Sequence, residues 1–398
     1  MSNIKRYIVV FFSVQFCMML SFSLWRAVFE NFAVEVCNID SVHRGMVESI
    51  REIPGAAIVV LSAVAIFFTE STLASLCLFI TSLGMFLFNF SSGFSSLALP
   101  LLLASTGMHL FMPIRSSLAL SLTQEGKKAR QLALLGTIGS IAGLVGPGLV
   151  YLIFTYIQID SLDIVGKSIS HIQFKSVFVL ATIVAVIGGI MMLTVSKGEK
   201  AELKQARFIF RRRYSLYYVI TFFAGCRRHI FTTFAAYALV KVHGVSAKNI
   251  AALMAVNSVL NICTRYPLGH FVDRIGEKRS LLLGYGILVF VFIGYAHIKY
   301  LPLLYTLYCL DNMCFGFEVA TTTYLDQIAP QEHIMQTISL GVTMNHLSAI
   351  PVPIIGGFIW EKFGYSWTFM TGAAILIFSL LAVSKIRTIE KGKEISEQ

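Results

Sequence analysis

Residues 71–114 contain no Asp, Glu, Lys or Arg and read STLASLCLFITSLGMFLFNFSSGFSSLALPLLLASTGMHLFMPI. One continuous helix of that length would reach about 66 Å, which is roughly twice the hydrocarbon core of a bilayer. The stretch must therefore turn back on itself. Its polar, glycine-containing segment NFSSGFSS at 89–96 predicts the hairpin between two membrane spans.

The composition of the whole chain is that of a polytopic membrane protein. Of its 398 residues, 56% are hydrophobic and 13% are charged, and the mean hydropathy is +0.74. One soluble core could not bury that much apolar surface. The seven cysteines are scattered through apolar stretches without paired spacing, so neither a disulfide framework nor a metal site is predicted, and no cofactor is expected.

The same length argument, applied along the chain, predicts an all-α integral membrane fold. We expect an N-terminal six-helix bundle at 1–195, a basic cytoplasmic linker at 196–213 and a C-terminal six-helix bundle at 214–398. The twelve predicted transmembrane helices are 7–29, 44–68, 72–90, 96–119, 131–157, 173–195, 214–240, 248–271, 280–297, 301–324, 334–358 and 366–386.

The placement of lysine and arginine predicts the orientation. With the N-terminus inside, the cytoplasmic segments hold nineteen of the 32 basic residues and the external segments hold seven. An excess on the cytoplasmic side favours a topology with both termini in the cytoplasm, and we expect the inner cell membrane. The net charge of +11 then belongs to the membrane surface and does not indicate nucleic acid. A monomer is expected.

Two segments repeat one pattern of glycine, acid and base. Residues 269–279 read GHFVDRIGEKR after the eighth span, and residues 357–364 read GFIWEKFG after the eleventh. Each has a glycine, three residues, an acid, a base, one residue and a second glycine. Because three helices separate the two copies, they lie on opposite sides of the membrane. This arrangement is typical of inverted three-helix repeats.

The first copy resembles the cytoplasmic loop signature of the major facilitator superfamily (MFS). The matching positions are Gly269, Asp273, Arg274, Gly276, Lys278 and Arg279. With six helices on each side of a linker, the resemblance covers the chain. It implies a transporter fold in which this motif has a gating role and helices 1, 4, 7 and 10 line a central cavity. The family's stronger copy, between helices two and three, is missing: residues 67–74 hold Glu70 as their only charge.

Intramembrane charges are expensive and usually face a cavity or a partner, so they are the candidate site. The predicted cavity helices hold most of them, and two neighbouring helices add lines of polar residues. The candidates for substrate binding are Arg26, Glu30, Arg227, Arg228, Asn257, Asn261, Asp311, Glu318 and His346. The candidates for proton coupling are Glu30, Asp311, Glu318 and His346, because their charge responds to burial and to moving arginines.

A structural interpretation of the same residues stays open. The predicted spans contain six arginines and six acids, a balance that would let nearly all of them form ion pairs. Residues Glu48, Arg51 and Glu52 lie within one helical turn. Either Arg51 and another cation neutralise both acids, or one acid takes up a proton.

The chain contains neither a phosphate-binding glycine loop nor a zinc-binding His-Glu-x-x-His helix, so an enzyme is not expected. We predict a secondary active transporter that moves a small polar solute, with anions as the candidate class, by proton-coupled alternating access. The expected partners are that solute and the lipid bilayer. Two alternatives remain: an MFS multidrug exporter of lipophilic cations, and a membrane sensor or membrane enzyme built on a transporter scaffold.

Overall fold

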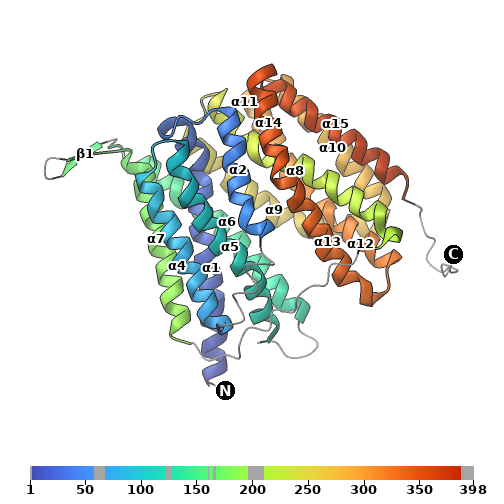
Figure 1. Ribbon diagram of the computed structural model, residues 1–398, viewed down its shortest axis with the longest axis horizontal. Coiled ribbons are helices and arrows are strands. Elements are labelled where there is room, and N and C mark those ends of the chain that lie inside the picture. The colour runs from blue at the N-terminus through green and yellow to red at the C-terminus, as the bar shows by residue number, and fades with distance from the viewer. Residues whose placement is uncertain are drawn as a thin grey trace. The chain divides into compact units, whose positions relative to one another are not determined.

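The computed structural model describes residues 2–57, 68–121, 128–159, 161–164, 167–195 and 210–386. These residues are almost entirely helical (Figure 1), and helix occupies most of the described residues in each of the twelve predicted ranges. By length and apolar composition, eight helical stretches of the described chain are candidate membrane spans. Most of the predicted linker and the second half of the predicted second helix lie outside the described residues.

The helices of the first half follow the predicted order. They are α1 (Ser2–Asn31) with a π-helical end η1 (Phe32–Val36), α2 (Ser41–Ala56), α4 (Glu70–Leu87), α5 (Phe94–Ser121), α6 (Lys128–Tyr156) and α7 (Ile172–Leu193). The predicted turn near residue 90 is confirmed: a short 3-10 segment, η2 (Phe88–Phe90), ends α4. A small antiparallel hairpin of β1 (Ser161–Ile164) and β2 (Lys167–Ser170) was not predicted.

The second half contains two interrupted spans. Its helices are α8 (Ser215–Lys241), preceded by η3 (Arg212–Tyr214), then α9 (Ala247–Ile275), α10 (Glu277–His297), α11 (Leu301–Cys314), η4 (Phe315–Glu318), α12 (Val319–Ile328), α13 (Gln331–Ala349), α14 (Pro351–Phe363) and α15 (Tyr365–Ser384). The predicted helix 301–324 is tightened by the 3-10 segment η4. The predicted helix 334–358 is two helices meeting at Ile350, because Pro351 and Pro353 lack backbone donors.

Contacts between residues divide the chain into two compact units. The first unit comprises Met1–Gln205, Thr232–Ile262 and Ala349–Tyr365. The second unit comprises Ala206–Phe231, Cys263–Ser348 and Ser366–Gln398. The first unit therefore includes segments from the second half of the sequence, and α8 and α9 each belong partly to both units.

Aromatic and small residues build the core of the first unit. Trp25 and Phe29 of α1 pack against Phe88, whose ring stacks on Phe178 of α7 at 5.3 Å between centroids. Helix α4 contacts α5 and α7, and α1 contacts α6 and α7 (Figure 1). At Gly84 an added Cβ would lie 2.5 Å from the backbone of α5, so only glycine permits this close helix approach.

An aromatic cluster fixes α8 in the second unit. The ring of Phe231 packs against Phe292 and Tyr295 of α10 at 5.5 and 5.2 Å between centroids. Both α10 rings also contact Phe369 of α15, and all four rings are buried. This cluster lies about one helical turn beyond Arg227 and Arg228, and so it holds the two arginines in a fixed position.

Candidate functional site

Four charged side chains meet in the second unit. Arg227 of α8 donates from Nη1 to Asp311 Oδ1 of α11 at 3.3 Å and from Nη2 to Glu318 Oε1 at 3.4 Å. Arg228 donates to the other oxygen of Glu318. Arg227 and Asp311 are fully buried, whereas the side chains of Arg228 and Glu318 are 32% and 28% exposed. The cluster therefore has a sealed pair and a partly accessible pair, and its formal charges sum to zero.

The aromatic ring of Phe315 supports both arginines. Their guanidinium carbons lie 4.6 Å and 5.1 Å from its centroid, close enough for cation–π attraction. Phe315 opens the 3-10 segment η4, and Glu318 closes it. A 3-10 stretch inside a longer helix often marks a point of strain or a hinge. Glu318 is thus the member of the cluster that stands at an irregular backbone segment.

A longer charged network lies in the first unit. Arg44 of α2 donates two hydrogen bonds to Glu30 of α1, at 2.7 and 2.8 Å, and a third to Glu48 at 3.2 Å. Arg51 then bridges Glu48 and Glu52. The three acids and Arg44 are all less than a tenth exposed, so their charges are balanced mainly by one another.

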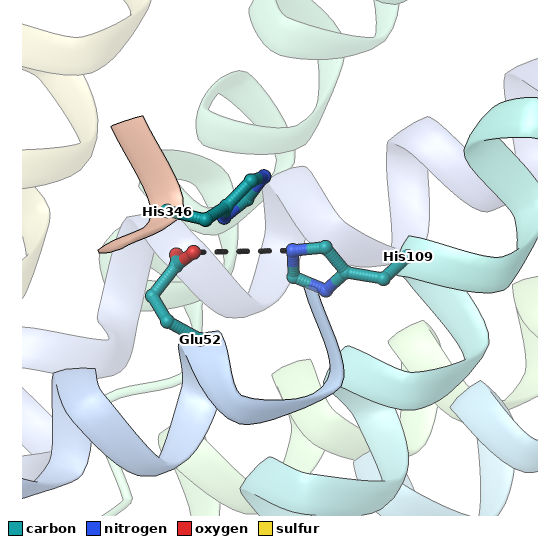
Figure 2. Close-up of side chains that lie close together, drawn as sticks. All are labelled: Glu52, His109 and His346. Carbon is teal, nitrogen blue, oxygen red and sulfur yellow. Dashed lines mark ion pairs between the residues drawn. The ribbon is translucent and has the colours of Figure 1, made fainter. Parts of the chain in front are cut away.

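The network includes a histidine. In Figure 2, Glu52 faces His109 of α5, with 4.0 Å between Oε2 and Nε2. The hydroxyl of Ser105 donates to the backbone oxygen of Arg51 and also contacts His109 Nδ1 at 3.0 Å, so α5 and α2 are joined at this point. His346 is drawn in the same figure; it belongs to α13 of the second unit.

The other predicted site residues have different surroundings. Arg26 is exposed, and no ion pair joins it to another residue that the structure describes. Asn261 donates to the backbone oxygen of Asn257 at 2.9 Å and to its side-chain oxygen at 3.2 Å. His346 is half-buried. Among the predicted site residues, the first-unit network includes Glu30.

Two contributors were missed from the sequence. Arg44 begins the predicted helix 44–68 but was not among the candidates, although it precedes Glu48 by four residues and Arg51 by seven, which places all three on one helical face. Phe315 looked like one apolar residue among many. No sequence signal distinguished Phe315, because cation–π contact depends on how α8 packs against η4.

The sequence matches the model of the Major Facilitator Superfamily over residues 11–353. The chain belongs to this superfamily. It is therefore an integral multi-pass membrane transporter and not an enzyme. A shorter relative match agrees: the chain is 27% identical over 131 residues to an uncharacterised MFS-type transporter of Methanocaldococcus jannaschii, a stretch that covers 32% of each protein.

Solved structures of MFS transporters share the fold at low sequence identity. The chain is similar to the nucleoside transporter NupG, with a TM-score of 0.74, 14% identity and coverage of 97% of this chain and 100% of that one. For a bacterial homologue of ferroportin in the inward-facing state the TM-score is 0.76, with 13% identity and coverage of 96% and 98%. For an inward-facing bacterial homologue of Spinster the values are 0.70, 13%, 94% and 95%.

The two copies of the MFS motif end in the same backbone conformation. Gly276 has φ +82° and ψ 163°, and Gly364 has φ +92° and ψ 160°, a region that side-chain-bearing residues rarely adopt. After the first copy, Lys278 donates to the backbone oxygen of Ile386 at 2.8 Å. Asp273 and Arg274 are exposed, and the structure describes no ion pair for either residue. Their gating role stays a prediction.

The second motif copy contacts α2 inside the first unit. Glu361 accepts a hydrogen bond from Ser41 at 2.7 Å, and Ser49 donates to the backbone oxygen of Ile350 at 2.6 Å. Between these bonds the helix backbones touch: an added Cβ at Gly45 would overlap the backbone oxygen of Pro353, and one at Gly357 would lie 2.5 Å from that of Ser41. Helices α2 and α14, from opposite halves of this MFS chain, are therefore in tight contact at the predicted external end.

Proposed function

We propose that this protein is a secondary active transporter that moves a small polar solute across the membrane by proton-coupled alternating access. The observation that supports this most directly is the cluster of Arg227, Arg228, Asp311 and Glu318. A sealed ion pair and a partly exposed one share a single arginine. Arg227 and Asp311 form the buried part of this cluster, and Arg228 and Glu318 form a part that a polar group can reach.

The charge pattern favours a polar or anionic solute over a lipophilic cation. A cation-binding site needs a carboxylate with no competing positive charge. In both networks the acids already contact arginine: Glu30 contacts Arg44, and Glu318 contacts two arginines. Some of the similar solved structures are described as nucleoside, peptide and iron transporters, which is in keeping with polar cargo.

The closed contact between α2 and α14 supports alternating access. These helices come from the two halves of the sequence, and their glycines allow backbone contact without interlocking side chains. This interface between α2 and α14, called the seam below, can separate by losing a few hydrogen bonds and small packing contacts. We therefore assign the contact to the closed external state of the transport cycle, in which solute access is from the cytoplasm.

Proton coupling rests on the acids of the arginine cluster. One oxygen of Asp311, Oδ2, is buried without a hydrogen-bond partner among the described residues. Protonation would make this oxygen a hydrogen-bond donor, and a shift of an arginine would give it a group from which to accept. Glu318, which contacts two arginines and is partly exposed, is the acid that solvent protons reach more easily.

The test is transport by the purified protein in liposomes. We expect an imposed pH gradient to drive accumulation of at least one solute from a panel of nucleosides, dipeptides and carboxylates, and an uncoupler to abolish it. Arg228→Ala should remove most of the flux, while Lys248→Ala, which removes a cation stacked on Tyr151 in the first unit, should leave it intact. Solute binding without any flux would instead favour a membrane sensor.

A further inference from the structure

The arginine cluster also indicates what chemical group the solute carries. Building on the proposed function, we infer that the solute presents one carboxylate, which takes the place of the Glu318 carboxylate between Arg227 and Arg228. Glu318 would then act as an internal occupant of the anion site. It holds the two arginines together until the solute arrives.

The geometry around Glu318 is that of a bound carboxylate. Its Oε1 accepts from Arg227 and its Oε2 accepts from Arg228, so one planar anion bridges two guanidinium groups. Arginine binds carboxylates well because its planar fork matches the two oxygens. The ring of Phe315 contacts both guanidinium groups and keeps them in position. A solute carboxylate in the same place would find every donor already oriented.

Charge balance sets the number of negative charges on that group. The cluster holds two arginines and two acids, so removing one negative charge leaves a buried excess of +1. An uncompensated charge at this depth costs several kcal/mol. One carboxylate restores neutrality, whereas a cation would increase the excess and a doubly charged phosphate would reverse it. The substrate class is therefore a monoanionic head group.

Glu318 is the acid that can leave, and Asp311 is the one that stays. Asp311 is fully buried and bonds to the inner arginine, whereas Glu318 is partly exposed and ends the 3-10 segment η4. An added Cβ at Gly316, inside η4, would overlap the tip of the Leu268 side chain, so this segment packs directly against Leu268. A change of η4 toward α-helix would rotate Glu318 away from Arg228.

The charged surroundings of Glu318 make it the acid that a solute carboxylate can replace. The groups that face it from the described elements are Arg227 and Arg228 of α8, Asp311 of α11 and Tyr285 of α10. Two of these groups are cations, and both would keep a negative partner when a solute carboxylate takes the place of Glu318.

Ligand-induced thermal stabilisation of the purified full-length protein tests this inference. The probes are acetate, lactate, benzoate and N-acetylalanine, with uridine as an uncharged probe and tetraphenylphosphonium as a cation. Wild type, Glu318→Gln and the control Glu70→Gln, which neutralises a half-buried acid on α4, are measured at pH 7.5. We expect Glu318→Gln to bind at least one monocarboxylate about tenfold more tightly than wild type at pH 7.5.

The control variant separates a local effect from a general one. The Glu70→Gln protein should bind the same monocarboxylate with the affinity of wild type. The inference is overturned if no monocarboxylate binds Glu318→Gln more tightly than wild type. It is also overturned if tetraphenylphosphonium binds wild type and loses affinity in Glu318→Gln.

Liposome flux separates this inference from the proposed function. If a proton gradient drives uptake of uridine while Glu318→Gln gains no affinity for carboxylates, the proposed transport function stands and the carboxylate inference fails. If carboxylates bind as expected but no solute crosses the membrane, the anion site stands and the transport proposal fails.

Discussion

Arg227 and Arg228 are adjacent in the chain, and their side chains have different environments because about 100° of helical rotation separates them. Arg227 is fully buried against Asp311, while Arg228 remains about one-third exposed. The ion pair of Arg227 with Asp311 is sealed from solvent, so it is the contact that stays when Glu318 is replaced. The pair of Arg228 with Glu318 is partly open to solvent.

This difference predicts separate effects of removing each arginine. Arg227→Ala leaves Asp311 buried without its cation and should destabilise the protein by about 3–5 kcal/mol. Arg228→Ala removes a partly exposed pair and should cost within about 1 kcal/mol while abolishing solute binding. Unfolding in SDS measures the first quantity, and ligand-induced stabilisation measures the second. An Arg227→Met/Asp311→Leu double variant, in which neither charge is left alone, should recover most of the lost stability.

The contacts of Arg44 predict that the first-unit network has a structural role. It is the cation that contacts both Glu30 and Glu48, so Arg44→Ala leaves two buried acids short of positive charge and should cost about 3–5 kcal/mol. Glu30→Gln keeps an acceptor for Arg44 and should be milder. Apparent melting temperatures of the two variants make the comparison. Equal losses would mean that the charge of Glu30 matters as much as that of Arg44, which would contradict this expectation.

The residue types of the candidate site were predictable, but their partners were not. Asp311 and Glu318 are seven residues apart, which predicted one helical stripe, and both contact Arg227. Arg44 begins the predicted helix 44–68, and hydropathy there cannot distinguish a paired arginine from a solvated one at the membrane surface. Which of two neighbouring arginines is sealed depends on how α8 packs against α11, and the sequence does not encode that packing in a local pattern.

Among the helices, α2 and α14 form the contact with the clearest consequence for transport. Both lie in the first unit, and two glycines at their interface bring main chain against main chain. The hydrogen bond between Ser41 and Glu361 closes one end of this seam, and the bond between Ser49 and Ile350 lies further along it. A side chain added inside the seam would meet backbone atoms, which cannot rotate aside.

Gly45→Val and Gly357→Val should therefore open this seam. Overpacking costs about 1–3 kcal/mol, which corresponds to a change of about 5- to 150-fold in the ratio of closed to open protein. A Cys at Ser49, which is buried in the closed form, reports the change through labelling by a membrane-impermeant maleimide in a chain without native cysteines. Gly148→Val is the matched control, because an added Cβ there meets no atom within 4 Å. Equal labelling in all three variants would contradict the gate assignment.

Element boundaries were predictable where composition changes sharply. The turn after α4 followed from a polar, glycine-containing segment inside a charge-free stretch. The break at Ile350 had a signal too, since Pro351 and Pro353 each remove a helical donor, but prolines inside α5, α6 and α9 do not interrupt those helices. At the break, Ser49 donates to the backbone oxygen of Ile350, and a partner of this kind satisfies backbone groups that an irregular helix leaves without an internal hydrogen bond.

For the whole molecule, the predicted spans put three connecting segments on the same side of the membrane. These segments follow the first, fifth and eleventh predicted spans, so an even number of spans separates each from the next. They include the N-terminal end of α2, the β1–β2 hairpin and the end of α14. The predicted spans therefore put the closed seam and the hairpin on the same side of the membrane, and the basic residues of the intervening loops predict that this side is external.

Cysteine labelling in intact cells tests this orientation. Ser161 at the start of β1 and Arg279 in α10 are both exposed, so a cysteine at either position is accessible when its side of the membrane is reached. We expect an impermeant maleimide to label the Ser161→Cys variant in intact cells and the Arg279→Cys variant only after permeabilisation, because the excess of basic residues holds the loop at residue 279 in the cytoplasm. The opposite pattern would place the closed seam of α2 and α14 at the cytoplasmic face, and the state described here would then be open to the outside.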